Sequence, residues 1–283
     1  MSMIFDRNEN KAVVALIGAG SMGTAIVRRI ATGKKILLGD VSEAVLERVS
    51  NDMTRCGYDV ETMIVNALDK DSVEAFARQA AQLGPVMYFI DTAGASPNQA
   101  SPEHIVNLDM IGTGYAVDAF GQVMAAGGAG LLISSQAAYM YPIPHEVESQ
   151  LVNTPTVQLA QVPFIRDVAM QNSGLAYMIA KRVNHLQAQR AAATTWRERH
   201  ARINTISPGV VVTPLAYDEF NANGEGYQRM IDASAARRAG TSDEIAEAAA
   251  FLLGEHAAFI TGTDLLIDGG VIASIRAGQY RLG

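Results

Sequence analysis

Short apolar runs alternate with amphipathic stretches along the first half of the chain. The apolar runs cover residues 12–17, 35–40, 62–65, 86–91 and 130–135. Helices are expected between them, over residues 21–32, 42–56, 71–83 and 102–126, and Ser21 and Ser42 are suitable N-caps for the first two. Continuously apolar strands that alternate with helices are typical of a parallel sheet covered on both faces. The pattern therefore predicts an α/β fold with a doubly wound parallel sheet, the Rossmann fold.

This alternation breaks after residue 135. Residues 136–172 hold four prolines and mixed polarity, and they are too many for an ordinary connection of about 4–6 residues. We expect short helices within this segment. Beyond it, the pattern predicts a helix over 173–199, a strand over 201–206, a helix over 242–253 and a last strand over 264–267. Because no internal repeat or linker interrupts the chain, residues 1–283 are expected to form a single domain.

Composition narrows the class of protein. The 283 residues include 49% hydrophobic ones, and the net charge of −7 argues against a nucleic-acid partner or an anionic membrane surface. The single cysteine, Cys56, excludes an internal disulfide and suits a reducing compartment. Residues 1–11 carry charges where a signal peptide has an apolar core, and glycines and polar residues interrupt the longest uncharged stretch, residues 119–144. We expect a cytoplasmic protein that makes no membrane contact.

A glycine-rich turn follows the first predicted strand. Gly18, Gly20 and Gly23 have the spacing G-x-G-x-x-G at the start of a predicted helix. Glycine permits a tight turn and a close approach of the backbone to a pyrophosphate, and a helix N-terminus favours negative charge. The turn therefore predicts a dinucleotide site that includes Ser21 and Met22, although a purely structural glycine turn is the alternative.

An acidic residue, Asp40, ends the second predicted strand. It lies near the spacing of about 20 residues at which a carboxylate binds the ribose 2′-hydroxyl of NAD. A carboxylate there repels a 2′-phosphate, and neither Val41 nor the glycine turn supplies a compensating cation. NAD is therefore favoured over NADP. The alternative is that Asp40 caps the next helix, in competition with Ser42.

Three residues suggest acid–base chemistry. Tyr177 and Lys181 lie four positions apart in a predicted helix, and so on one face of it. A nearby ammonium favours the phenolate and is expected to lower the pKa of the tyrosine. Ser135 ends the fifth predicted strand, where open α/β sheets place their ligand crevice. No single one of these signals is decisive.

Taken together in order, these motifs resemble the short-chain dehydrogenase/reductase family over roughly residues 12–272. The glycine turn, the Tyr-x-x-x-Lys pair and Ser135 match, and four further segments are similar to family motifs: residues 66–73, 91–94, 203–214 and 260–270. The resemblance implies that Tyr177 exchanges the proton of the substrate oxygen, that Ser135 orients the substrate, and that Lys181 binds the nicotinamide ribose. It also implies cofactor contacts from Asn66, Ala67, Thr92, Ala93, Gly94, Pro208, Gly209, Val211 and Thr213.

The chain departs from the family pattern in three places. Its glycine turn is one residue shorter than the common family form, with Ile17 where the family has threonine. Asp109 occupies the position of an asparagine that supports a proton path from the lysine to solvent, so its charge is expected to alter the surroundings of Lys181. Finally, residues 136–172 replace a short link, and they resemble insertions found in bacterial hydroxysteroid dehydrogenases.

Two segments are candidates for the substrate side. Apolar residues of the 136–172 insertion form either a pocket wall, a subunit interface or simple packing onto the domain; they are Tyr139, Met140, Tyr141, Val162, Phe164 and Met170. Residues 215–231 resemble the substrate lid of the family. His145 could reach a substrate, but a surface position is favoured, and the five histidines show no metal-ligand grouping, so we expect no metal.

The leading hypothesis is an NAD-dependent oxidoreductase that acts on a secondary alcohol or ketone of small or medium apolar size. The family resemblance also implies a homodimer or homotetramer. One alternative is a catalytically weak or inactive dinucleotide-sensing protein on the same fold, which the altered glycine turn and Asp109 motivate. A second is a 3-hydroxyacid dehydrogenase, because the opening of the chain also resembles that family; it would require a helical second domain.

Overall fold

Seven parallel strands form the central sheet of the computed structural model, which describes residues 11–281 apart from the side chains at positions 215 and 222. The expectation about a targeting signal falls mostly on residues 1–10, which lie outside the described part. The strands are β1 (Val13–Ile17), β2 (Lys35–Asp40), β3 (Asp59–Ile64), β4 (Val86–Asp91), β5 (Met124–Ile133), β6 (Arg202–Pro208) and β9 (Asp264–Ile267). Their order is β3-β2-β1-β4-β5-β6-β9, so the predicted doubly wound sheet in a single domain is confirmed.

The strand order reverses at β1, which pairs with β2 on one side and with β4 on the other. All five residues of β1 are buried, because helices cover both faces of the sheet. Leu16 lies beside Leu38 of β2 and Ile90 of β4. In an open α/β sheet, a crevice forms beyond the carboxyl ends of the strands at such a reversal. The glycine turn that follows Ile17 therefore lies where a ligand is expected.

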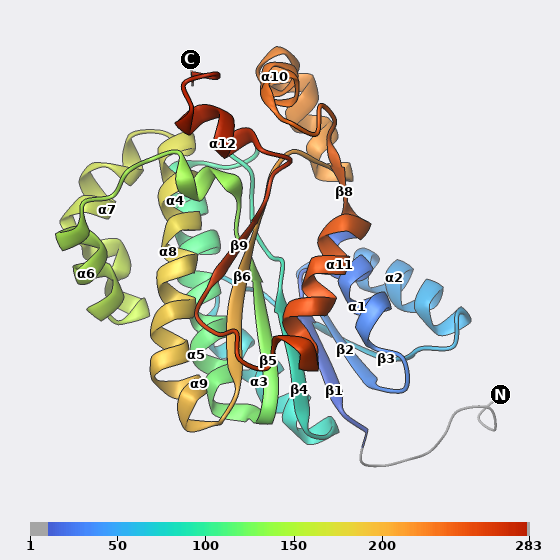
Figure 1. Cartoon of the computed structure of the whole chain (residues 1–283). Helices are drawn as coiled ribbons and strands as arrows, with labels where there is room; N and C mark the ends of the chain where they lie inside the picture. Colours follow the sequence, from blue (N-terminus) through green and yellow to red (C-terminus); the bar gives the residue numbers. More distant parts are fainter. Residues whose placement is uncertain (1–10, 282–283) are drawn as a thin grey trace.

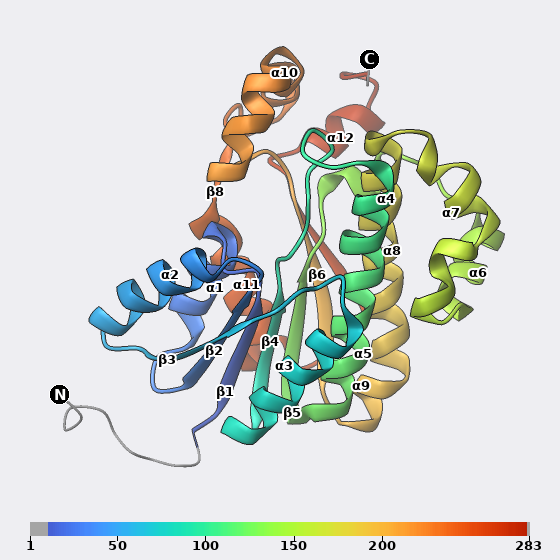
Figure 2. The same ribbon diagram turned by 180° about the vertical axis from the view of Figure 1, so that it is seen from behind.

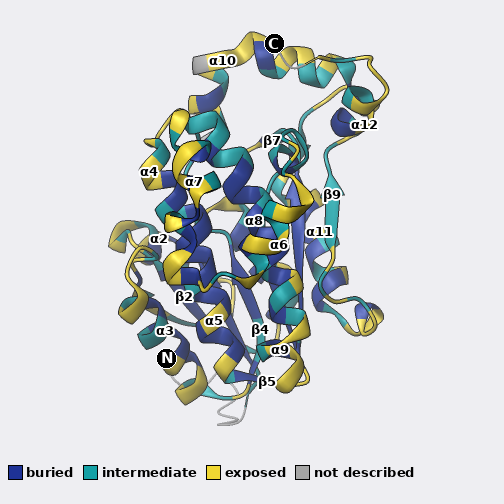
Figure 3. Ribbon diagram, turned by 90° about the vertical axis from the view of Figure 1, so that its left-hand side faces the viewer, coloured by how far each residue is buried: buried dark blue, intermediate teal, exposed yellow. Residues whose placement is uncertain are grey.

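Helices cover the sheet in two layers (Figures 1 and 2). One face carries α1 (Ser21–Ile30), α2 (Glu43–Arg55) and α11 (Ser242–Leu253). The other carries α3 (Lys70–Leu83), α5 (Thr113–Val123), α8 (Ser173–Ala193) and α9 (Thr195–Glu198). Trp196 of α9 is fully buried there, and its indole donates a hydrogen bond to the Val117 carbonyl at 3.0 Å. Figure 3 shows the buried positions gathered on the sheet and on the inner faces of these helices.

The segment 136–172 packs outside α8 as a further layer. It contains η2 (Gln136–Tyr139), α6 (His145–Asn153), η3 (Thr156–Gln161), α7 (Pro163–Asp167) and η4 (Ala169–Gln171). Val162 is buried in an apolar cluster with residues of α8, and Tyr141, Phe164 and Met170 pack against that cluster. For these four residues, packing onto the domain is the alternative that the structure supports. His145 is exposed, as favoured.

Another group of elements lies at the carboxyl end of the sheet. It contains β7 (Val211–Val212), α10 (Pro214–Ala233), β8 (Gly240–Thr241) and α12 (Val271–Arg276), whereas η5 (Glu255–Ala257) links α11 to β9 at the opposite end of the sheet. Residues 215–231, expected to be a lid, belong to α10, which stands at this end of the molecule (Figure 1). Backbone angles at Asn223 are not helical and divide α10 into two parts. Within the described residues, no helix combines the length and apolarity that crossing a membrane requires.

Several expected boundaries were wrong. The helix expected over 102–126 is α4 (Pro102–Ile105), a π-helix η1 (Val106–Gly112) and α5, and the strand β5 begins directly at Met124 instead of at residue 130. The start of β5 is rich in glycine and alanine, so no strand pattern marks it in the sequence. Its pairing with β4 is also irregular between Val86 and Tyr88. The helix expected over 173–199 breaks at Thr194, and the N-cap of α1 is Gly20 instead of Ser21.

A buried polar network joins α8 to the edge of the sheet. The His185 Nε2 atom lies 2.9 Å from Ser207 Oγ and 3.2 Å from Asp264 Oδ1. Tyr139 donates a hydrogen bond to Asp264 Oδ2 at 2.6 Å, so this residue of the 136–172 segment also has a structural role. Burial lowers the pKa of His185 to about 4, although Asp264 opposes the change. The folded protein therefore holds this histidine neutral.

This network predicts a loss of stability in mild acid. Because the folded pKa of His185 lies below the unfolded value of 6.5, its contribution is complete above pH 6.5 and is lost as the pH falls towards 4. Between pH 7.5 and pH 5.0, the wild type should lose about 2 kcal/mol more free energy of unfolding than His185→Gln. Urea unfolding at the two pH values measures this difference.

The comparison between variants is needed because burial also raises the pKa of a carboxyl group, Asp91, to about 6. His145→Gln, a change at an exposed position, serves as the control and should keep the wild-type pH dependence. An equal loss of stability in the wild type and in His185→Gln would show that His185 does not stay neutral in the fold.

Candidate active site

A buried lysine, Lys181, lies at the centre of the site. It is 5% exposed, and its Nζ atom lies 3.3 Å from Asp109 Oδ2 and 3.3 Å from the Ile133 carbonyl oxygen. The same Nζ lies 5.5 Å from the centre of the Tyr177 ring, one turn earlier on α8. The structure thus places the tyrosine and the lysine on one face of the helix, and it adds a carboxylate partner for the ammonium.

Asp109 is fully buried in the π-helix η1. Its Oδ1 accepts a hydrogen bond from the Ala95 amide at 2.8 Å, and its backbone carbonyl accepts one from Asn184 Nδ2 at 2.7 Å. A π-helix is rare and often occurs at functional sites, because the extra residue in the turn redirects side chains. Asn184 of α8 was not predicted from the sequence, since only the fold brings it against η1.

Ser135 and Tyr177 line one cavity of about 350 Å³. Ser135 follows the end of β5 by two residues, and the preceding Ser134 donates a hydrogen bond to the Lys181 carbonyl at 2.8 Å. This bond joins the end of β5 to α8 and so sets Ser135 beside Tyr177. The cavity is also lined by Ser96, Pro97, Asn98, Gln136, Met140, Met178, Gly209, Val211, Thr213, Ala216, Glu219, Phe220, Asn223, Tyr227 and Met230, among others.

The electrostatic environment of Tyr177 differs from the expectation. Burial raises the pKa of its phenol above the ordinary value of 10, and this effect outweighs the lowering by Lys181 and by hydrogen bonding to Ser135. Asp109 raises the pKa of Tyr177 further. The expectation of a net lowering was therefore wrong for the folded chain, because the spacing in the sequence reveals the ammonium but neither the burial nor the opposing carboxylate.

Lys181 stays protonated in these surroundings. Burial lowers its pKa, but the charge of Asp109 and the neighbouring Tyr177 raise it more, so the pKa of Lys181 lies above its ordinary value. Burial also raises the pKa of Asp109 against the opposing effect of Lys181. A second carboxyl, Asp91 at the end of β4, has a pKa raised by burial to about 6. One ammonium thus faces two buried carboxyl groups.

The turns after β1 and β4 contact each other closely. Gly18 has φ +90°, and a Cβ atom there would lie 2.7 Å from the Ala93 nitrogen. Thr92 donates a hydrogen bond from Oγ1 to the Gly18 carbonyl at 2.6 Å. At Gly94, a Cβ atom would come within 3.2 Å of both Asp109 Oδ2 and Lys181 Nζ. Glycine is therefore required at position 18, whereas a side chain at position 94 would press on the Asp109–Lys181 ion pair.

Gly20 differs from its two partners in the glycine turn. A Cβ atom at Gly23 would lie 2.6 Å from the Gly18 carbonyl oxygen, whereas a Cβ atom at Gly20 would meet nothing within 4 Å. Gly20 is also the N-cap of α1, whose first turn includes Ser21 and Met22 and carries no acidic residue. This arrangement leaves open space at the positive end of a helix, and so the turn fits a pyrophosphate.

Asp40 lies against the same turn. Its Oδ2 accepts a hydrogen bond from the Ala19 amide at 2.8 Å, and its Oδ1 accepts one from the Ser42 amide at 2.9 Å. Ser42 itself caps α2 by accepting a hydrogen bond from the Val45 amide at 3.4 Å. Asp40 thus joins the glycine turn to the start of α2, and Val41 beside it is 70% exposed.

The remaining candidate cofactor residues lie on two loops. Asn66 is exposed, its Oδ1 accepts a hydrogen bond from the Leu68 amide at 3.1 Å, and Ala67 follows it. Pro208 ends β6, and Gly209 follows it with no space for a Cβ atom, which would lie 2.6 Å from Asp268 Cα. Thr213 accepts a hydrogen bond from the Ala216 amide at 3.0 Å as the N-cap of α10. Gly209, Val211 and Thr213 line the cavity of Ser135 and Tyr177.

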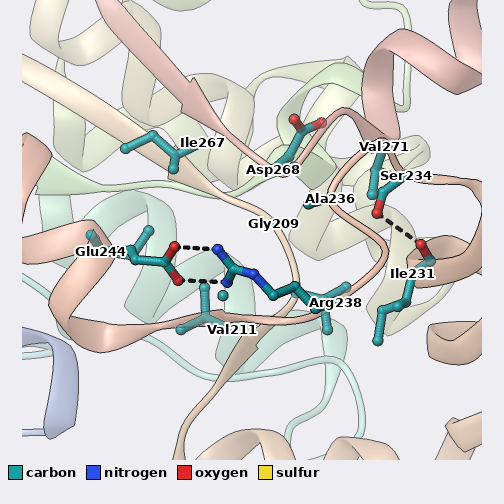
Figure 4. Close-up of a pocket in the computed structure, with 14 residues that line it drawn as sticks. Gly209, Val211, Ile231, Ser234, Ala236, Arg238, Glu244, Ile267, Asp268 and Val271 are labelled. Carbon is teal, nitrogen blue, oxygen red and sulfur yellow. Dashed lines mark hydrogen bonds and ion pairs between the residues drawn. The ribbon is translucent and has the colours of Figure 1, made fainter.

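A second, smaller cavity of about 160 Å³ lies behind the loop of Gly209 and Val211 (Figure 4). Arg238 and Glu244 form a bidentate ion pair at its edge, in which the two guanidinium nitrogens lie 2.6 and 2.9 Å from the two carboxylate oxygens. This cavity holds none of the acid–base residues, so it is not the candidate reaction site. The described residues contain no group of three or more potential metal ligands.

Comparison with known proteins places the chain in a family. A sequence model described as enoyl-(acyl carrier protein) reductase matches residues 157–272. A short-chain dehydrogenase/reductase of Alternaria brassicicola is 39% identical over 267 residues, which are 93% of this chain and 97% of that protein. The chain therefore belongs to the short-chain dehydrogenase/reductase family, as the motifs predicted. Proteins of this family are oxidoreductases that use nicotinamide cofactors on small molecules, so this chain is an enzyme of that class.

A further relative and a solved structure are similar to this chain over most of its length. Galactitol 2-dehydrogenase (L-tagatose-forming) of Cereibacter sphaeroides is 29% identical over 269 residues, covering 92% of this chain and 94% of that protein. Among solved structures, a short-chain dehydrogenase/reductase from Serratia marcescens superimposes with a TM-score of 0.72 at 22% identity, over 93% of this chain and 99% of the other. The single domain and the family assignment argue against the alternative family of 3-hydroxyacid dehydrogenases, which requires a helical second domain.

Proposed function

We propose that this protein is an NAD-dependent oxidoreductase that transfers a hydride between the cofactor and a secondary alcohol or ketone, with Tyr177 as general acid and base. The observation that carries the proposal is the common cavity of Ser135 and Tyr177, with the Lys181 ammonium one helical turn away. Relatives whose names give alcohol substrates, galactitol and D-threitol, support the reaction class.

Each residue has a distinct task in this proposal. Tyr177 gives its phenolic proton to the carbonyl oxygen during reduction, or removes the hydroxyl proton during oxidation. Ser135 donates a hydrogen bond to the same oxygen and fixes the orientation of the substrate. The nicotinamide cofactor supplies or accepts the hydride. Lys181 binds the ribose next to the nicotinamide, and its charge opposes the effect of burial on the pKa of Tyr177.

The cofactor contacts form three groups. The glycine turn, with Ser21 and Met22, would hold the pyrophosphate at the N-terminus of α1. Asp40 and Val41 would contact the adenosine ribose, and Asn66 and Ala67 would contact the adenine. Towards the nicotinamide end, the proposed contacts come from Thr92, Ala93, Gly94, Tyr177, Lys181, Pro208, Gly209, Val211 and Thr213. The negative charge of Asp40 beside the glycine turn supports NAD over NADP, because it repels a 2′-phosphate.

A cytoplasmic location and a homodimer or homotetramer remain predictions that accompany this function. The role of α10 as a substrate lid is also part of the proposal. It is supported by the six residues that α10 contributes to the cavity wall, Ala216, Glu219, Phe220, Asn223, Tyr227 and Met230.

The Tyr177→Phe variant tests the proposed mechanism. Removing the phenolic hydroxyl should lower kcat by at least about 100-fold, because the other phenol of the cavity wall, Tyr227, already donates its proton to Glu219 Oε2. NAD affinity, measured by fluorescence titration, should change less than about threefold. The assay follows absorbance of the reduced nicotinamide with a panel of secondary alcohols and ketones.

Full activity of Tyr177→Phe would overturn the proposed mechanism. Tight NAD binding by the wild type without turnover of any substrate in the panel would favour the alternative of a dinucleotide-sensing protein.

The Asp40→Asn variant tests the cofactor preference. Asparagine keeps a hydrogen-bond acceptor for the glycine turn but removes the charge that repels a 2′-phosphate. The wild type should favour NAD over NADP at least about tenfold in kcat/KM, and Asp40→Asn should reduce this ratio at least about fivefold. Glu43→Gln, at an exposed position in the first turn of α2, is the matched control and should keep the ratio. A wild type that prefers NADP would contradict the assignment of NAD.

A further inference from the structure

Buried polar atoms without partners concentrate around the cavity of Ser135 and Tyr177. Five buried side-chain oxygens make no hydrogen bond among the described residues. One is Asp109 Oδ2, which forms the ion pair with Lys181, and three belong to residues that line this cavity: Ser96 Oγ, Gln136 Oε1 and Glu219 Oε1. A buried polar group without a hydrogen bond costs about 1–3 kcal/mol, more when it is charged. Such groups therefore call for a specific explanation, and three around one cavity point to a bound ligand.

Glu219 carries the strongest of these signals. The residue is only 7% exposed, and its Oε2 accepts hydrogen bonds from Asn98 Nδ2 at 2.7 Å and from the Tyr227 hydroxyl at 2.8 Å. Its Oε1 has no partner among the described residues. Two donors thus hold one carboxylate oxygen and leave the other available. The torsion that turns a carboxylate is soft, so a small rotation can present Oε1 to a ligand in the cavity.

The two neutral groups come from other parts of the wall. Ser96 follows β4 and Gln136 begins η2, and each is 6% exposed. The Gln136 amide nitrogen lies 3.8 Å from Met230 Sδ of α10, while its oxygen is unpaired. Three residues from different parts of the chain, each with an unpaired side-chain oxygen, therefore line one cavity. None of them takes part in the proton exchange assigned to Tyr177 and Ser135.

The chemistry of the acceptors identifies the class of ligand. A substrate with one hydroxyl group and an apolar skeleton would use that hydroxyl at Tyr177 and Ser135, and it would leave Glu219, Gln136 and Ser96 unpaired. Hydroxyl groups at neighbouring carbons supply the missing donors, and the methionine and phenylalanine side chains of the wall can contact the carbon chain. The cavity therefore fits a polyol better than the apolar alcohol expected from the sequence.

We propose that Glu219 is a specificity-determining residue that accepts a hydrogen bond from a second hydroxyl group of a polyhydroxylated substrate. This inference rests on the proposed oxidoreductase function and names the substrate class of the same site. A carboxylate accepts a stronger hydrogen bond from a hydroxyl group than a neutral acceptor does. The interaction holds the substrate by a group that is not oxidised, while Tyr177 and Ser135 contact the reacting oxygen.

A pair of substrates that differ by one hydroxyl group tests the proposal. We expect the wild type to oxidise 2,3-butanediol with a kcat/KM at least about tenfold above that for 2-butanol. In Glu219→Gln this ratio should fall at least about fivefold, mainly through a higher KM for the diol. The control is Glu225→Gln, the same change on the same helix at a side chain that is 95% exposed; it should keep the wild-type ratio. Thermal unfolding checks that both variants fold.

Two results would overturn the proposal. One is equal efficiency of the wild type with both alcohols, or an equal loss for both in Glu219→Gln. The other is a preference for protonated 3-amino-2-butanol over the diol, which would assign the carboxylate to a cationic substrate.

Absence of any turnover would instead contradict the proposed function. In that case, a binding measurement tests whether Glu219 recognises a polyol. Calorimetry with threitol and the NAD-saturated wild type should show binding that Glu219→Gln weakens. No binding of threitol, or equal binding by both proteins, would overturn the inference as well.

Discussion

The arrangement of the site depends on the burial of one positive charge. An ammonium removed from water loses several kcal/mol of solvation, and it keeps its proton only if a charged or polar partner replaces the water. Asp109 and the Ile133 carbonyl are these partners for Lys181. They come from η1 and β5, whereas the lysine comes from α8. The pairing therefore joins three elements, and it fixes the position of α8, and so of Tyr177, relative to Ser135 at the end of β5.

The ion pair of Lys181 with Asp109 also affects the phenol of Tyr177. Asp109 shares the ammonium with Tyr177, and together with burial it keeps the pKa of the phenol above its ordinary value. The fold places the opposing charges close together, with Asp91 as a further buried carboxyl. The residue that departs from the family pattern thus influences both the lysine and the tyrosine.

Much of the fold could be predicted from the sequence, because its signals are local. The apolar runs that become β1, β2 and β4 are buried on both faces and keep their expected bounds within one residue. Tyr177 and Lys181 share a face because four residues are about one turn of a helix. The turn after β1 was predicted from its glycines, and Gly18 and Gly23 indeed leave no room for a side chain.

Features that depend on distant contacts could not be predicted. The π-helix around Asp109 is one of them: Ala95 and Asn184, which lie in other parts of the chain, donate hydrogen bonds to the side chain and the backbone carbonyl of Asp109. The early start of β5 lies in a glycine-rich stretch whose pattern resembles a turn. Glu219 and Gln136 had no motif to single them out, and only their common cavity with Tyr177 gives them a role.

The pH dependence of oxidation by Asp109→Asn tests most directly whether one buried ammonium is shared between Asp109 and Tyr177. Asparagine keeps an acceptor for the Ala95 amide but removes the charge that raises the pKa of Tyr177. The account predicts that the acidic limb of the kcat/KM profile moves down by about one pH unit relative to the wild type. An unmoved limb, or one that moves to higher pH, would contradict it.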